Sequence, residues 1–144
     1  MAIINLEIIT AERKVFSETV SVVVAPGTDG ELGILPDHAP LLTTLQPGEL
    51  KIIKEGQESF IAISGGFIEV LGDKVIVLAD TAERSEEIDI DRAEKALQRA
   101  NERVEEAQSD IDLERAVASL RKSHTRLKVA NRRSRSTRMP SQPS

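Results

Sequence analysis

The chain has 144 residues, no cysteine, 40% hydrophobic residues and a formal net charge of −5. This length allows one or two small domains, and the lack of cysteine excludes disulfides, thiolate metal sites and a cysteine nucleophile. The N-terminus has no basic region with a cleavage site after it, and no apolar run approaches the ~20 residues that span a bilayer. We therefore expect a protein without a signal peptide that is soluble or peripheral to a membrane.

Charge is distributed unevenly along the chain. Residues 1–80 and residues 81–114 each carry 5 basic and 12 acidic side chains, a net charge of −7 for each segment. From Arg115 to the end there are 9 basic residues and no acidic ones. This last segment is expected to interact with an anion.

The first half, residues 1–85, is predicted to be a β domain. Ile4, Leu6 and Ile8 alternate with polar residues, which is typical of a strand with one buried face. Short apolar runs follow, separated by Gly, Pro and Asp, and they cover residues 15–16, 20–25, 34–35, 41–45, 50–53, 60–63, 67–71 and 75–79. Gly72-Asp73 between the last two runs indicates a tight hairpin. This spacing, with no helical interval, predicts an antiparallel β-sandwich or barrel.

Residues 86–130 are predicted to form an antiparallel hairpin of two helices, so the fold class is α+β in two parts. Two apolar stripes recur at three- and four-residue steps: Ala93, Ala96, Leu97, Ala100, Val104 and Ala107, then Leu113, Ala116, Val117, Leu120 and Leu127. Asp89 or Asp91 can cap the first helix, and Ser109, Asp110 or Asp112 the second. Alanine-rich seams bury little area, so such a hairpin can open. Residues 131–144, rich in Arg, Ser and Pro, are predicted to be a disordered basic tail.

The sequence contains few residues or motifs typical of catalysis, and the isolated chain is predicted not to be an enzyme. The sequence contains no phosphate-binding loop, nucleophile elbow or metalloprotease motif, and we expect no metal site. Asp89 and Asp91 point to different sides of a helix, so they are not an acid/base pair. His38 has no partner cluster and is expected to order its loop.

The basic segment has three readings: a solvated face, a surface that docks on an acidic protein, or a nucleic-acid site. The chain has no Trp or Tyr for base stacking, and the β half is acidic. Both facts weigh against a nucleic-acid partner.

One stretch is more specific than the rest. In residues 31–42, Glu-Leu-Gly-Ile-Leu-Pro-Asp-His-Ala-Pro-Leu-Leu, two prolines and a glycine shape a rigid loop. Together with residues 64–70, residues 77–80 and the β-domain-plus-hairpin order, this stretch resembles the epsilon subunit family of the F-type ATP synthase. The resemblance covers about residues 3–130.

The resemblance implies a non-catalytic part of the central stalk that couples proton flow to ATP synthesis. Its partners would be the gamma subunit, the c-ring and the alpha/beta catalytic head. It would be peripheral to an energy-coupling membrane, on the cytoplasmic side. The ring and gamma interface would include Glu31, Leu32, Gly33, His38, Ala39 and Pro40.

The resemblance also implies regulation by the hairpin, which in this family lies folded or extends into the catalytic head and inhibits ATP hydrolysis. The cations available for the extended state are Arg115, Arg121, Lys122, Arg126, Lys128, Arg132 and Arg133.

No cofactor is required, but residues 88–93 match a family motif that holds regulatory ATP in some members. By that resemblance the ATP contacts would be Glu83, Ile88, Asp89, Arg92, Ala93, Arg99, Lys122 and Arg126. Lys122 occupies a position where the family members that bind ATP best carry arginine, so it offers a single ammonium charge instead of a guanidinium group that can donate two hydrogen bonds. The second reading is local: Asp89 caps the helix and Arg92 pairs with a nearby acid. The alternative function is a free β-domain and helical-hairpin factor that binds nucleic acid or its machinery.

Overall fold

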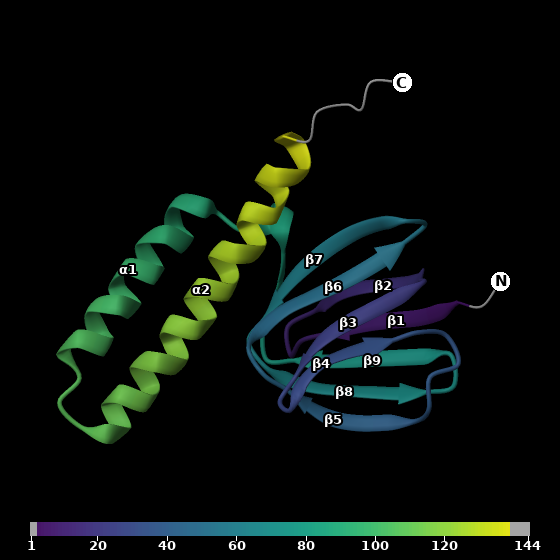
Figure 1. Ribbon diagram of the computed structural model, residues 1–144, viewed down its shortest axis with the longest axis horizontal. Coiled ribbons are helices and arrows are strands. Elements are labelled where there is room, and N and C mark those ends of the chain that lie inside the picture. The colour runs from purple at the N-terminus through teal and green to yellow at the C-terminus, as the bar shows by residue number, and fades with distance from the viewer. Residues whose placement is uncertain (1–2, 139–144) are drawn as a thin grey trace. The chain divides into compact units, whose positions relative to one another are not determined.

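The computed structural model describes residues 3–138, and their side chains through Arg132. It divides into two compact units, Met1–Glu83 and Arg84–Ser144. Figure 1 shows strands in the first unit and helices in the second. This boundary lies close to the predicted one after residue 85. The two-part α+β prediction is confirmed.

The first unit is a single sheet that curls around its core. Its strands follow the order β10-β7-β6-β3-β5-β8-β9-β1-β2, with β4 paired to β3, and β2 contacts β6 so that the sheet comes close to closing on itself. The strands are β1 (Ile4–Ile9), β2 (Lys14–Val20), β3 (Val22–Gly27), β4 (Gly30–Ile34), β5 (Leu41–Leu45), β6 (Gly48–Lys54), β7 (Gln57–Ile63), β8 (Gly66–Leu71), β9 (Lys74–Ala79) and β10 (Ala82–Arg84). The short strand β10 was not predicted.

The core is aliphatic and follows from alternation along the strands. In β1, Ile4, Leu6 and Ile8 are buried while the residues between them are half-buried. Ile68 and Val70 do the same in β8, and they pack with Val77 of β9 in one cluster. Every second side chain of a strand points to the same face, so these sequences place one row inside.

Two features set the register of the sheet. Gly72, at φ +63°, lies in the two-residue connection between β8 and β9, which confirms the predicted hairpin. Gly66 approaches β9 so closely that an added Cβ would lie 2.0 Å from the Leu78 carbonyl oxygen. One pairing differs from the antiparallel prediction: β1 pairs with β9 in parallel. These strands are distant in sequence, so no hairpin connection imposes their direction.

The second unit consists of a short 3-10 turn, η1 (Ser85–Glu87), and two helices, α1 (Ile90–Glu106) and α2 (Asp110–Arg138). Asp89 is the N-cap of α1, and its side chain accepts from the Arg92 backbone N–H at 3.2 Å. The Ser109 hydroxyl accepts from the Asp112 backbone N–H at 3.1 Å at the start of α2. Both caps are among those predicted.

The second helix is longer than predicted. α2 continues to Arg138, so the prediction of a disordered tail from residue 131 is wrong for residues 131–138, whose backbone is helical. The sequence has no Pro or Gly in this stretch before Pro140, and arginine is a good helix former. Residues 139–144 of the predicted tail lie outside the described residues.

Candidate functional site

The loop of residues 35–40 is ordered by its own hydrogen bonds. Asp37 takes a positive φ of 65°, and the His38 backbone N–H donates to the Leu35 carbonyl at 3.2 Å. The imidazole Nδ1 of His38 lies 2.7 Å from the Ala39 carbonyl oxygen. This agrees with the expectation that His38 orders its loop. Ala39 and Pro40 are exposed.

The strand before this loop presents the remaining predicted interface residues. Glu31 and Gly33 are exposed in β4, and Leu32 is half-buried against the core. Their partners across the ladder lie in β3, where Gly33 pairs with Val24. Glu31 is therefore an outward-facing carboxylate near the β3–β4 turn, well placed for a polar partner.

An apolar face lies on the outside of β5, β8 and β9. Leu42, Phe67 and Leu78 are 68%, 52% and 52% exposed, and Leu71 is also exposed. Phe67 is paired with Leu78 in the ladder, so their side chains share the outer face. Exposed apolar side chains gathered on one face of a small domain mark an interaction surface. We call Leu42, Phe67, Leu71 and Leu78 the outer apolar face.

The outer apolar face was missed in the sequence, although a signal was present. Residues 67–71 and 75–79 are nearly continuous apolar runs, whereas a strand with one solvated face alternates strictly. Phe67 and Leu71 of the first run and Leu78 of the second alternate with the buried residues, and the structure places these three outward.

In the second unit, helical spacing places six cations on one side of the hairpin. Arg92, Arg99 and Arg103 recur at steps of seven and four on α1, and Arg115, Lys122 and Arg126 do so on α2. Arg126 is half-buried, and the other five are exposed. Arg103 and Arg115 line one groove, which places these two rows on the same side of the hairpin.

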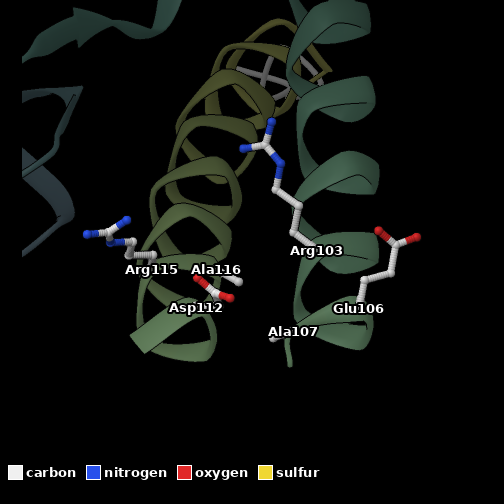
Figure 2. A pocket seen from close by; sticks show the side chains of 6 residues that line it. All are labelled: Arg103, Glu106, Ala107, Asp112, Arg115 and Ala116. Carbon is white, nitrogen blue, oxygen red and sulfur yellow. The ribbon is translucent and has the colours of Figure 1, made fainter. Parts of the chain in front are cut away.

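That groove lies at the tip of the hairpin and holds about 290 Å³. Figure 2 shows Arg103 between the helices, Arg115 directed away from α1, and Asp112 at the groove floor beside Ala116. The two guanidinium groups diverge and a carboxylate lies near them. The tip is therefore not a preformed anion clamp.

The motif residues around the start of α1 have mainly structural positions. Ile88 and Ala93 are 1% and 0% exposed, so neither offers surface to a ligand. One carboxylate oxygen of Asp89 accepts the capping hydrogen bond from the Arg92 backbone N–H, and the Arg92 side chain is exposed on the first turn. The helix-cap reading of Asp89 is confirmed, and it leaves the second oxygen available for a further donor.

The other predicted residues are spread along the second unit and its entry. Glu83 is half-buried in β10, Arg121 and Lys128 are exposed on α2, and Arg132 is half-buried. The side chain of Arg133 lies outside the described residues. Within the described chain, no helix could cross a membrane, and no group of three or more His, Cys, Asp or Glu side chains could hold a metal ion.

Comparison with known proteins gives concordant matches for both units. The model of the ATP synthase delta/epsilon chain β-sandwich domain matches residues 3–85, and that of the delta/epsilon long α-helix domain matches residues 86–131. The ATP synthase epsilon chain of Pelotomaculum thermopropionicum is 60% identical over 126 residues, covering 88% of this chain and 94% of the relative. That of Herpetosiphon aurantiacus is 55% identical over 130 residues, covering 90% and 96%.

A solved structure has the same fold. A chain in the cryo-EM structure of the Euglena gracilis mitochondrial ATP synthase, which contains OSCP, F1 and the c-ring, superposes with a TM-score of 0.78. It is 26% identical in sequence, and the match covers 91% of this chain and 82% of that chain. On this evidence the chain belongs to the ATP synthase delta/epsilon chain family.

Proposed function

We propose that this chain is a non-catalytic subunit of the central stalk of a proton-translocating ATP synthase. It binds the gamma subunit and the c-ring through its β unit and reaches the alpha/beta head through its helical unit. It is peripheral to the energy-coupling membrane, on the cytoplasmic side. Curated relatives named ATP synthase epsilon chain, and a similar chain in a complex with F1 and the c-ring, support this role.

The observation that carries the proposal is the outer apolar face. A coupling subunit must bind gamma tightly enough to rotate with it, and burial of apolar area contributes about 25 cal/mol of binding free energy per Å². Phe67 and Leu78 lie side by side on hydrogen-bonded strands whose inner rows are packed in the core. Apart from Glu69, which is exposed on the same row of β8, the face is therefore apolar, and it is rigidly supported, as a docking surface for gamma requires.

Binding of gamma tests this assignment. Replacing Phe67 and Leu78 together with Ala is expected to weaken co-purification with gamma at least about tenfold, since truncating buried aromatic and aliphatic anchors costs about 2 kcal/mol or more. Leu113→Ala is the matched control, because Leu113 is a 42% exposed leucine on α2. Equal retention of gamma by the double variant and the control would reject the outer apolar face as the gamma site.

The inhibitory role rests on the cations of α2. Arg115, Arg121 and Lys122 are exposed there, in a segment of the sequence that holds no acid. Exposed cations can pair with acidic loops of the catalytic head when the hairpin extends. Removing residues 88–144 should raise ATP hydrolysis by the assembled complex, whereas an unchanged rate would reject inhibition by the hairpin.

Regulatory ATP is the second part of the proposal. Arg92, Arg99 and Lys122 lie exposed on one side of the hairpin, where guanidinium and ammonium groups suit phosphates. Titration calorimetry of the whole chain with ATP should detect binding that Arg99→Gln weakens. Arg121→Gln is the control, since exposed Arg121 is turned about 100° from Lys122 on α2 and lines a different groove, with Val117 and His124. No heat at millimolar nucleotide would reject the ATP site.

Family membership disfavours the nucleic-acid alternative, and an acidic protein partner would account for the basic residues of α2. Strongly salt-dependent binding to DNA or RNA by the purified chain would revive it.

A further inference from the structure

Burial along α2 is concentrated near the C-terminal part of the helix. Between Asp110 and His124 a single residue, Ala116, is buried. In the next turn and a half, Thr125, Val129 and Ala130 are all buried, and the last two are 0% exposed. Among its described side chains, helix α2 is thus buried on more than one side only at residues 125–130, and its earlier part is buried only at Ala116.

The buried residues in this region lie on opposite sides of the helix. Ala130 follows Ala116 by fourteen residues, close to four turns, so it lies on the same side of α2 as Ala116. Thr125 follows Ala116 by about two and a half turns and points the other way, and Val129 lies one turn beyond Thr125. Contact with α1 on the Ala116 side of the helix does not explain the burial of Thr125 and Val129.

The segment that leads into α1 lies against this region. The turn η1 contacts α2, and Figure 1 shows the segment between β10 and α1 passing the C-terminal half of α2. Within this segment Ser85 and Ile88 are 6% and 1% exposed, although neighbouring Glu86, Glu87 and Asp89 are exposed. The entry segment therefore buries the side chains of Ser85 and Ile88 next to the part of α2 where Thr125 and Val129 point away from α1.

We propose that these residues form a clasp, and that the clasp, not the alanine seam, holds the hairpin closed. The clasp consists of Ser85 and Ile88 from the entry segment and Thr125 and Val129 from α2. This deepens the proposed function, because release of the clasp becomes the step that lets α2 swing away and reach the catalytic head.

Side-chain size supports this division of labour. The fully buried positions of the seam are Ala93, Ala100 and Ala116, whose methyl groups bury little area. Its larger side chains, such as Leu97 and Leu120, are only half-buried. The clasp buries an isoleucine and a valine completely. Opening therefore depends on a small contact around one turn of α2, and substitutions there should act on the whole helix.

Amide hydrogen exchange on the full chain tests the clasp, because exchange reports local opening. Val129→Ala should accelerate exchange of α2 residues 113–124 about tenfold, the fold-change expected for removing two buried methyl groups. Val117→Ala is the matched control. Both variants make the same change of helix propensity on the same helix, but Val117 is 40% exposed.

Ile88→Val supplies a milder change from the other side of the clasp. Loss of one methyl group should accelerate exchange in α2 about threefold, although residue 88 is not part of that helix. The clasp is rejected if Val129→Ala and Val117→Ala behave alike, or if Ile88→Val leaves α2 unchanged. It is also rejected if strands β8 and β9 accelerate as much as α2, since Val129 would then stabilise the whole chain.

The assembled complex separates the clasp from the proposed function. With Val129→Ala, ATP hydrolysis should fall relative to the Val117→Ala complex, because the extended, inhibitory state gains population. Faster exchange of α2 without any change in hydrolysis would establish the clasp and overturn the inhibitory role of the hairpin.

Discussion

The two units of this protein differ in the size of the side chains that they bury. The β unit buries large aliphatic side chains, and Ile8, Leu50 and Ile68 are 0% exposed. The seam of the helical unit buries Ala93, Ala100 and Ala116. Because apolar burial contributes about 25 cal/mol per Å², the sheet has a core of its own and the hairpin depends on a few contacts.

This difference suits the two mechanical roles proposed above. A subunit that transmits torque needs a base that does not deform, and close-packed cores resist deformation. A brake needs an element that leaves its resting place at small cost, and two states can be exchanged by differential contacts only when they differ by a few kcal/mol. The uneven distribution of burial meets both proposed requirements within one chain.

Separating the units is expected to have the largest effect. A chain that ends at Arg84 should keep its sheet and unfold cooperatively, because the core cluster lies entirely within it. Residues 85–144 alone should unfold gradually on heating, followed by circular dichroism, because their fully buried positions are mostly alanine and they have no large aliphatic core. A sharp, cooperative transition in the isolated helical segment would contradict this difference between the units.

Ile68→Ala should destabilise the β unit by about 2–5 kcal/mol, measured by urea unfolding, because it leaves a cavity at a fully buried site. Leu71→Ala is the control on the same strand, where the leucine is 62% exposed. Its cost should stay within about 0.5 kcal/mol. Similar costs for both variants would mean that the sheet lacks the packed core described above.

Asp89→Ala should destabilise the first turn of α1 by about 1 kcal/mol, because the Arg92 backbone N–H loses its side-chain acceptor. Faster amide exchange at residues 91–93, with the strands unaffected, would show that the effect is confined to the helical unit. Asp91→Ala removes a carboxylate from the same turn that is not the N-cap, and it should cost less.

Lys54→Ala should have the smallest effect, about 0–1 kcal/mol of unfolding free energy. The ammonium group of Lys54 lies 3.0 Å from Glu18, but both side chains are well exposed and water screens the pair. A loss of several kcal/mol on urea unfolding would show that surface charges, not the aliphatic core, hold β2 and β6 together.

Local chemistry decided most of the elements from the sequence alone. Alternation at Ile4, Leu6 and Ile8 specified a half-buried strand, Gly72-Asp73 specified a hairpin, and Asp89 and Ser109 specified helix starts. Each of these signals acts through neighbours in the chain, so it can be read without knowing the rest of the fold. The tail was misjudged because composition suggested disorder where no helix breaker stood before Pro140.

Only the tertiary structure decided what depends on segments far apart in the chain. The parallel pairing of β1 with β9 joins residues about seventy positions apart, and no local rule selects it. The outward row that contains Phe67 and Leu78 became a surface only when strands β8 and β9 were paired in register. Likewise Thr125 and Val129 are ordinary helix residues in the sequence, and folding alone encloses them, because burial is a property of what packs around a residue and not of the residue itself.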